Sequence, residues 1–224
     1  LVFPGDPPTS MSMTPRPDRY QHDLPASLLD HAVRQISVMR EAAGPDVDIC
    51  LDTGVNYKTE GAIRLARALE PFKLFWLEID GLSPRSLARL REPTSTPICS
   101  GEVLTTSRQY LPYFEAGSMD TAMVDVQYQG FSSSKRVADL AEIFDTNIAP
   151  HNFNGHLSTF QSLNLCATVP NVRIMETDPL QVTWRDELFT ELPAFDGGYL
   201  DMPVGPGWGT ELIEASARKY AYDL

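Results

Sequence analysis

Hydrophobic positions fall into two alternating kinds of pattern from residue 25 onward. Short apolar runs typical of buried strands alternate with segments in which apolar residues recur every three or four positions, as on one face of a helix. The predicted helices cover residues 25–43, 59–70, 83–92, 106–117, 134–144 and 158–169. The predicted strands are VDICLD, LFWLEID, TPICSGE, TAMVDV, TNIAPH and VRIMETD. This repetition predicts an α/β fold around a parallel sheet, whose strands are apolar on both faces.

Both ends of the chain depart from this alternation. The first 25 residues are rich in proline and polar side chains, so we expect a long loop there. The stretch after the last predicted strand includes WRDELFTELPAFDGG and is expected to be irregular, because proline and glycine are frequent in it. No GxGxxG or P-loop pattern follows any predicted strand, which disfavours a nucleotide-binding Rossmann or flavodoxin-like fold.

Each predicted strand ends in one ionisable residue. The six are Asp52, Glu78, Glu102, Asp125, His151 and Glu176, and successive members are 23 to 26 residues apart. In a parallel α/β barrel the carboxyl ends of all strands open on one face, where such enzymes carry their active sites. One polar residue at a strand end is common because a loop begins there, but six in consecutive units predict a shared site.

Three of these residues, Asp52, Glu78 and Glu102, come from consecutive strands and offer only carboxylate oxygens. Hard oxygen ligands suit Mg²⁺ and also Mn²⁺, whereas zinc would call for histidine and cysteine in spacings that this chain lacks. Carboxylates gathered on one face repel one another, so a bound cation would stabilise them. The sequence therefore predicts a Mg²⁺ site, with Mn²⁺ as an alternative.

His151 and Asp125 have the character of an acid/base pair. His151 lies in the segment APHNFNGH, and Asp125 ends the preceding predicted strand. Adjacent strands would bring the carboxylate within hydrogen-bonding reach of the imidazole and fix its tautomer. We therefore expect His151 to transfer protons while Asp125 orients it. His156, in the same loop, has no such neighbour in the sequence pattern.

The composition narrows the range of partners. With 30 acidic and 18 basic residues the net charge is −12, which disfavours nucleic acid and anionic membranes as partners. A hydrophobic share of 42% indicates an ordinary globular domain. The 224 residues are somewhat few for a complete (β/α)₈ barrel, which usually needs roughly 250.

The cysteines and the first residues bear on the cellular compartment. Cys50, Cys99 and Cys166 lie far apart in apolar contexts, so we expect three buried thiols in a reducing compartment. The chain has no run of 18 apolar residues, and its first residues do not have the pattern of a secretory signal. These features predict a cytoplasmic location.

The order of the motifs resembles the mandelate racemase-like branch of the enolase superfamily. The matching pieces are LD at 51–52, WLE at 76–78, SGE at 100–102, VDVQYQGF at 124–131, APHNFNGH at 149–156, METD at 175–178 and MPVGPGWGTEL at 202–212. The likeness covers nearly the whole chain. It implies that residues 1–224 form the C-terminal barrel domain, a TIM-type (β/α)₈ barrel represented by strands three to eight. The N-terminal capping domain and the first two strands would lie outside this chain.

The resemblance also implies a role for individual residues. Asp52, Glu78 and Glu102 would bind Mg²⁺, His151 and Asp125 would form the acid/base pair, and Glu176 would hydrogen-bond the substrate carboxylate or its enediolate. In the mannonate-type enzymes, the loop after the second strand carries an Arg and a Tyr that act on the substrate. Here Arg16 and Tyr20 are the corresponding catalytic candidates, and Arg19, His22 and Asn152 are candidates for substrate binding.

The implied reaction is Mg²⁺-dependent removal of a proton next to a carboxylate. The leading hypothesis is a hydro-lyase that dehydrates a sugar acid to a 2-keto-3-deoxy acid, because polar residues near the strand ends, such as Gln127 and Asn154, suit a polyol. The partner would be a small-molecule carboxylate, and the family implies a homo-oligomer. Gly54 departs from the pattern, since some sugar-acid dehydratases have a histidine two residues after the first metal ligand.

Two other functions remain open at this point. A racemase or epimerase would use the same intermediate but would need a base on each face of the substrate. A catalytically silent relative would keep the metal and substrate contacts for binding or regulation, although no strand end shows degeneration.

Overall fold

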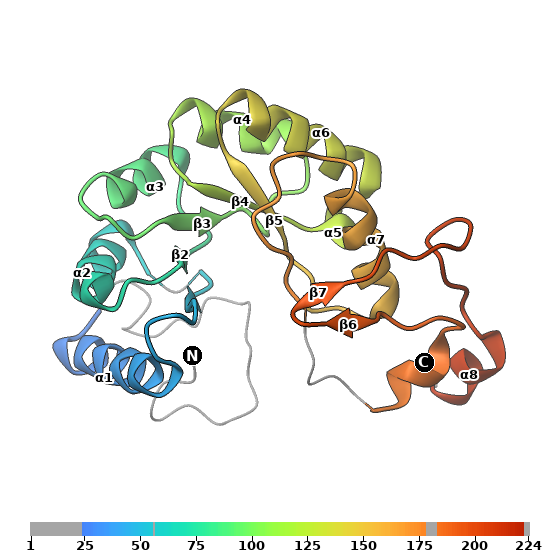
Figure 1. Cartoon of the computed structure of the whole chain (residues 1–224). Coiled ribbons are helices and arrows are strands. Elements are labelled where there is room, and N and C mark those ends of the chain that lie inside the picture. Colours follow the sequence, from blue (N-terminus) through green and yellow to red (C-terminus); the bar gives the residue numbers. More distant parts are fainter. Residues whose placement is uncertain (1–23, 56, 178–182, 222–224) are drawn as a thin grey trace. The chain divides into compact units, whose positions relative to one another are not determined.

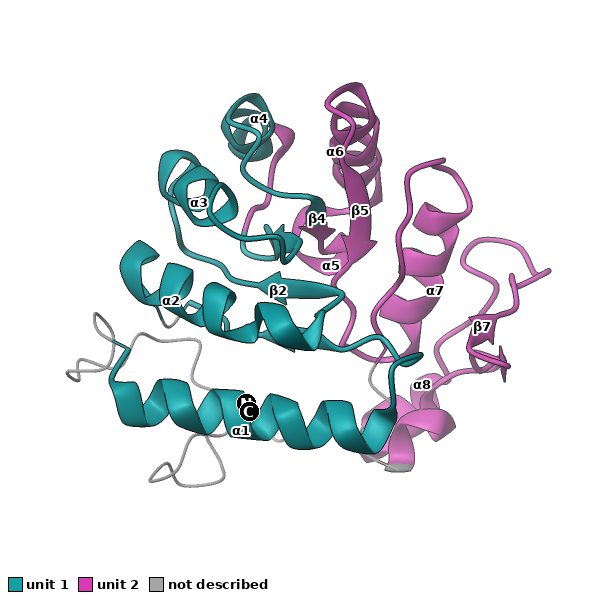
Figure 2. Ribbon diagram, turned by 60° about the vertical axis from the view of Figure 1, so that its left-hand side comes forward, with its two compact units in different colours: residues 1–103, 108–122 teal, residues 104–107, 123–224 magenta. Residues whose placement is uncertain are grey.

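The structure is a computed structural model that describes residues 24–55, 57–177 and 183–221. The chain divides into two compact units, which Figure 2 shows in different colours. Unit 1 comprises residues 1–103 and 108–122, and unit 2 comprises residues 104–107 and 123–224. The strands hydrogen-bond in the order β1-β2-β3-β4-β5, so the predicted α/β fold with a parallel sheet is confirmed.

Unit 1 alternates helices and strands. It contains α1 (Ala26–Ala43), β1 (Cys50–Asp52), α2 (Thr59–Leu69), the 3₁₀ helix η1 (Glu70–Phe72), β2 (Trp76–Glu78), α3 (Pro84–Arg91), β3 (Ile98–Ser100), most of α4 (Ser107–Glu115) and the first half of β4 (Thr121–Val124). Parallel pairing places Asp52 opposite Glu78, and Cys99 lies opposite Thr121. In Figure 1, α2 and α3 lie along the same side of these strands.

The core of unit 1 follows from its hydrophobic spacing. Ala62, Leu65, Ala66 and Leu69 recur at helical intervals on α2, and all four are buried. The helix α2 packs against α3, whose first turn has Pro84 at its start and is capped by the side chain of Ser83. β2 and β3 are buried along their whole length, as expected for strands covered on both faces.

Unit 2 continues the alternation and then changes character. It contains α5 (Val126–Gln129), α6 (Phe131–Ile143), β5 (Asn147–Pro150), α7 (His156–Cys166), the 3₁₀ helix η2 (Thr183–Leu188), an antiparallel pair β6 (Phe195–Asp196) and β7 (Tyr199–Leu200), and α8 (Glu214–Lys219). The helix α6 packs against β5 and α7 and buries Val137, Ala138 and Ala141.

The segment expected to form the last strand runs beside β5. Val172 forms an isolated parallel bridge with Ile148, and Arg173 donates its backbone N–H to the Ile148 carbonyl over 2.8 Å. Further along, the backbone N–H of Glu176 donates to the Pro150 carbonyl over 3.2 Å. This segment therefore places Glu176 near the end of β5, although it forms only one bridge rather than a full strand.

The other predictions can be compared element by element. All six expected helices are present as α1, α2, α3, α4, α6 and α7. The expectation that the C-terminal stretch is irregular was wrong in part, because it contains η2, the β6–β7 pair and α8. The short helix α5 was not predicted. These elements are short, and so they carry little periodic signal.

The prediction of three buried thiols was correct for Cys99 and wrong for Cys50. Cys50 is exposed because β1 is the first strand in the sheet order and begins at that residue, whereas Cys99 is completely covered in β3. Cys166 is intermediate in exposure, and burial of its thiol raises its pKa to about 12. None of the described helices combines the length and apolar character needed to cross a membrane.

Candidate metal and acid/base site

Three carboxylates gather at the carboxyl ends of β2 and β3 in unit 1. One carboxylate oxygen from each of Glu78, Asp80 and Glu102 lies within 4.8 Å of those of the other two. All three residues are buried, with exposed fractions of 4%, 2% and 8%. Like charges held this closely away from bulk water repel one another, and a divalent cation would neutralise that repulsion.

Asp80 is built into the surrounding backbone. Its Oδ1 accepts hydrogen bonds from the Gly101 backbone N–H over 2.8 Å and from the Ser100 hydroxyl over 3.1 Å. The Gly101 carbonyl in turn accepts from the Tyr110 hydroxyl over 2.7 Å. Gly101 has φ of 121°, a backbone conformation that favours glycine. These contacts fix the turn that carries Glu102 toward the other carboxylates.

Sequence reasoning did not single out Asp80. A usable signal was present, because Glu78 and Asp80 are two residues apart in LEID and side chains two apart on an extended segment share a face.

Burial raises the pKa of the nearby Tyr113, and the Asp80 carboxylate adds to this rise because its charge disfavours a second anion.

Asp52, the first expected ligand, lies at the end of β1 opposite Glu78 in the parallel register. Paired residues of adjacent strands point to the same face, so the two side chains share that face of the sheet. Asp52 is exposed and accepts the Gly54 backbone N–H at Oδ1 over 2.7 Å. It is not one of the three carboxylates whose oxygens lie within 4.8 Å of one another.

The donor atoms of the carboxylate group fit magnesium. Glu78, Asp80 and Glu102 offer oxygen only, and Mg²⁺ prefers carboxylate oxygens while keeping some positions for water or a ligand. The same set would be a poor choice for zinc, which favours nitrogen and sulfur.

In unit 2, Asp125 and His151 form a buried hydrogen-bonded pair. His151 Nδ1 lies 2.6 Å from Asp125 Oδ2, and the Asp125 side chain is completely buried. The other oxygen of Asp125 accepts the backbone N–H groups of Gln127 and Tyr128 over 2.5 and 3.0 Å at the start of α5. A carboxylate can only accept, so Nδ1 carries the proton and Nε2 is the nitrogen left to exchange one.

Glu176 lies on the Nε2 side of this pair. Its Oε2 is 4.0 Å from His151 Nε2 and accepts the Asn152 backbone N–H over 2.7 Å. The Glu176 side chain is 40% exposed, whereas the imidazole is 8% exposed. Of the expected residues, the structure therefore brings Asp125, His151 and Glu176 together in unit 2.

Asn152 has an environment different from the one expected for a substrate contact. It is completely buried, and its side-chain nitrogen donates to Thr159 Oγ1 over 3.1 Å and to the Glu176 carbonyl over 2.9 Å. The rings of Tyr128 and Phe153 flank His151 instead, with centroids 5.9 and 5.2 Å from the imidazole centroid.

A second histidine, at the first position of α7, has a separate acidic partner. His156 Nε2 lies 2.7 Å from Asp186 Oδ1, and this hydrogen bond, with a smaller effect of Arg185, holds the Asp186 pKa below its ordinary value. The expectation that His156 has no acidic neighbour was therefore wrong. Thirty residues separate the two partners, so no local spacing could show the pairing. Arg16, Arg19, Tyr20 and His22 lie outside the described residues.

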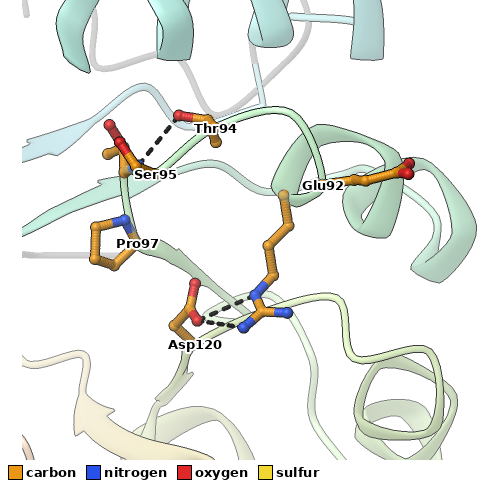
Figure 3. A pocket seen from close by; sticks show the side chains of 7 residues that line it. Glu92, Thr94, Ser95, Pro97 and Asp120 are labelled. Carbon is orange, nitrogen blue, oxygen red and sulfur yellow. Dashed lines mark hydrogen bonds and ion pairs between the residues drawn. The ribbon is translucent and has the colours of Figure 1, made fainter.

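Unit 1 also contains a polar pocket of about 360 Å³ at the opposite ends of the strands (Figure 3). It is lined by Arg91, Asp120 and the segment that leads into β3. Asp120 Oδ1 accepts from the Arg91 guanidinium over 2.6 and 3.0 Å, and Oδ2 accepts the Ile98 backbone N–H over 2.8 Å. These acceptors are already used within the protein, so the pocket is a weaker candidate than the carboxyl ends.

Comparison with known proteins decides the family. The sequence model for the enolase C-terminal domain-like family matches residues 14–216. The chain belongs to this family. The resemblance to the mandelate racemase-like branch of the enolase superfamily is thereby confirmed, and the described parallel sheet with its helices is consistent with part of the barrel of these enolase-like domains.

Named relatives of this enolase-like domain include sugar-acid dehydratases. The D-xylonate dehydratase of Haloferax volcanii is 28% identical to this chain over 199 residues. The aligned residues cover 87% of this chain and 48% of that protein. A D-galactonate dehydratase family member of Salmonella virchow is 30% identical over 211 residues, which cover 91% of this chain and 48% of the relative. The chain thus spans about half the length of the curated relatives it matches.

A solved structure of similar fold comes from Burkholderia xenovorans. That protein, named as a candidate L-alanine-DL-glutamate epimerase and bound to magnesium and fumarate, is 42% identical to this enolase-like domain. The TM-score is 0.86 over 88% of this chain and 49% of that one.

Proposed function

We propose that this chain carries the metal-binding and acid/base residues of an enzyme that dehydrates a sugar acid. The observation that carries the proposal is the buried pair of Asp125 and His151 with Glu176 beside Nε2. The named relatives add support, because two of them are named as D-xylonate and D-gluconate dehydratases and others as members of the D-galactonate dehydratase family.

The acid/base step follows from the tautomer of His151. Because Nδ1–H is donated to Asp125, neutral Nε2 has a lone pair that can take a proton, and the resulting imidazolium is stabilised by the buried carboxylate. In a dehydration, a base takes the proton from the carbon next to the carboxylate, and an acid gives one to the departing hydroxyl, which leaves as water. His151 would perform one or both of these transfers.

The proposed metal ligands are Glu78 and Glu102 together with Asp52, which lies opposite Glu78 in the parallel register. Asp80 lies beside Glu78 and Glu102, but its Oδ1 already accepts from Ser100 and Gly101, so we assign it to holding the turn at Gly101. When bound, Mg²⁺ would supply a positive charge against the negative charge that develops on the substrate carboxylate. The three ligands would place that charge at the carboxyl ends of their strands. The metal ligands themselves would not transfer the proton.

Glu176 is proposed to hydrogen-bond the substrate carboxylate or its enediolate. Its Oε2 already accepts the Asn152 N–H, so its position is fixed, and its partial exposure leaves the rest of the group accessible. The substrate would be a small polyhydroxy acid, and we expect the enzyme to be a cytoplasmic homo-oligomer, as in the implied family.

An epimerase is the second candidate, because the related Burkholderia xenovorans protein has that name and is 42% identical. An epimerase returns the proton to the opposite face of the same carbon and loses no water. The two functions are distinguished by incubating sugar acids in deuterium oxide and assaying both the 2-keto product and the recovered substrate. Deuterium in an inverted substrate without any keto acid would favour the epimerase.

The main test of the proposal is His151→Asn in the intact protein. We expect kcat to fall by about 10²- to 10⁴-fold, the usual worth of a general acid or base, while Mg²⁺ and substrate affinity stay within a few-fold. Asp125→Asn should give a smaller loss, since an amide still accepts the two N–H groups at the start of α5.

His156→Asn is the matched control, because His156 is also buried, has its own acidic partner in Asp186 and lies only five residues after His151 in the chain. It should keep kcat within a few-fold. If His151→Asn retains full turnover, or loses Mg²⁺ binding in place of turnover, the acid/base assignment is wrong.

A further inference from the structure

Asn152 directly follows His151 in the chain and contacts Glu176 through both its backbone and its side chain. We propose that Asn152, held in place by Thr159, is a positioning residue that fixes Glu176 next to His151. This inference deepens the proposed function and rests on it, because it gives Glu176 its place relative to the proton-transfer group. It assigns Asn152 a role inside the protein in place of a direct contact with substrate.

Asn152 holds Glu176 at two points. Its backbone N–H donates to Glu176 Oε2 over 2.7 Å, which fixes the end of the side chain. Its side-chain nitrogen donates to the Glu176 carbonyl over 2.9 Å, which fixes the backbone at the start of the same side chain. One residue therefore restrains both ends of the glutamate.

The Glu176 carbonyl determines which way the Asn152 amide faces, and Thr159 holds the amide in that orientation. A backbone carbonyl only accepts, so the amide nitrogen must lie toward Glu176, and its second hydrogen is donated to Thr159 Oγ1 over 3.1 Å. Both residues are buried, with Asn152 at 0% and Thr159 at 6% exposed. Thr159 belongs to α7, and so the helix serves as the fixed support of this contact.

Glu176 needs such support because its side chain is 40% exposed and would otherwise sample several rotamers. Its Oε2 lies 4.0 Å from His151 Nε2, which is longer than a direct hydrogen bond but close enough for both groups to contact one small substrate. Displacement of a positioning group by about 1 Å can reduce the rate by as much as about 100-fold. Loss of the Asn152 contact should therefore affect turnover more than binding.

The central variant is Thr159→Val, which replaces the accepting oxygen by a methyl group of similar size. Thr159→Ser keeps the oxygen and is the rescue variant. Thr146→Val is the matched control, because Thr146 is another buried threonine of unit 2, 7% exposed, and its hydroxyl donates to the Phe144 carbonyl over 3.3 Å. Thr159→Ala replaces Thr159→Val if the latter does not fold.

The first readout does not need activity. In ¹H–¹⁵N spectra of the folded chain, Thr159→Val should shift the Asn152 backbone amide and the His151 imidazole signals, because both report on the Glu176 carboxylate. Thr159→Ser should restore them, and Thr146→Val should leave them in place. If the Asn152 amide does not move in Thr159→Val, the inference is wrong whatever the enzyme does.

The second readout is kinetic. Thr159→Val should lower kcat by about 10- to 100-fold with KM within a few-fold. Combined with Glu176→Gln, it should cost no more than Glu176→Gln alone, since Asn152 and Thr159 act only through that glutamate. Additive losses would indicate a general structural effect and overturn the inference.

The two proposals fail in different ways. Shifted spectra with no activity toward any sugar acid would refute the proposed function and leave the positioning role intact. Unshifted spectra with a normal response of kcat to His151→Asn would refute the positioning role alone.

Discussion

Acidic side chains at the two ends of the strands in unit 1 have opposite surroundings. At the amino ends, Asp120 and Glu70 lie next to donors, and each hydrogen bond is accounted for within the protein. At the carboxyl ends, Glu78, Asp80 and Glu102 lie next to one another. The same residue type therefore stabilises the fold at one end and is available for chemistry at the other.

At the amino ends, the acids connect segments that are distant in sequence. Asp120, just before β4, joins the Arg91 guanidinium to the backbone at the start of β3 (Figure 3). Glu70 accepts the Ser95 backbone N–H over 2.6 Å and both hydroxyls of Thr94 and Ser95 over 3.0 and 3.1 Å. These carboxylates are stabilised in their charged form by what surrounds them.

At the carboxyl ends, carboxylates that are buried close to one another cost free energy. Asp80 is partly compensated by Ser100 and Gly101, but the three oxygens within 4.8 Å still repel one another. Such an arrangement is stable when a bound ligand compensates the repulsion between the carboxylates. The difference between the two ends teaches that the environment of an acid, more than its presence, marks a site.

The largest effect is expected from variants of the carboxylates at the carboxyl ends of the strands. Glu78→Gln or Glu102→Gln should weaken Mg²⁺ binding by more than about 100-fold, because even changes around a ligand cost about 10- to 100-fold. Without metal, both variants should be at least as stable as the wild type, since a repulsive charge is gone. Calorimetric titration and thermal unfolding with and without Mg²⁺ give both quantities.

Binding of Mg²⁺ to the folded protein alone determines how large the stability difference should be. A wild-type protein at a Mg²⁺ concentration 100 times its Kd gains about 2.7 kcal/mol, a gain that the two variants should lose. Asp120→Asn changes an acid of the same unit at the other strand ends and should keep the whole gain. Undiminished Mg²⁺ binding in Glu78→Gln would remove that residue from the metal site.

A smaller effect is expected at the amino ends. Asp120→Ala leaves the Ile98 N–H without its acceptor and Arg91 without its partner, which should lower the free energy of unfolding by about 1–3 kcal/mol. The ion pair itself adds little, because the Arg91 side chain is 44% exposed. Urea unfolding measures the loss. Asp120→Asn keeps an acceptor and should lose less stability than Asp120→Ala. Equal losses in the two variants would show that the stabilisation depends on the charge of Asp120.

The sequence predicted what depends on local repetition. Helical spacing gave α2 and α3 because each carries several turns of periodic apolar residues, and the strand ends gave the candidate residues because parallel strands share one direction. The pairing of Asp125 with His151 was also predictable, since each ends one of two successive strands. The one-domain prediction for residues 1–224 and the metal set with Asp52 stay predictions.

The remainder depends on contacts that have no local spacing. The His156 contact joins α7 to Asp186 in η2, and the Asn152 contact joins a loop to Thr159 in α7. Only the folded chain brings these partners together. Asp80 was overlooked for another reason. One ionisable residue was assigned to each strand, although the strand with Glu78 carries two on one face.

The smallest predicted effect concerns Glu70 and the pH dependence of stability. Hydrogen bonds, first from the Ser95 backbone N–H and then from the Thr94 and Ser95 hydroxyls, hold the pKa of Glu70 below its ordinary value of 4.5. A folded-state pKa below the unfolded one means that the unfolded chain binds more protons between the two values. The stabilising contribution of Glu70 is therefore complete above pH 4.5 and is lost as the pH falls through the folded-state pKa.

Glu70→Gln cannot titrate, so the wild type should exceed this variant in stability at neutral pH by a margin that shrinks below pH 4.5. Urea unfolding of both proteins from pH 7 to pH 3 measures that margin. Glu92→Gln controls for the loss of one negative charge, because Glu92 lines the pocket of Figure 3 without a hydrogen bond to another side chain drawn there. A margin that stays constant down to pH 3 would show that the contacts of Glu70 do not depend on its charge, and the contrast between the two strand ends would then rest on Asp120 alone.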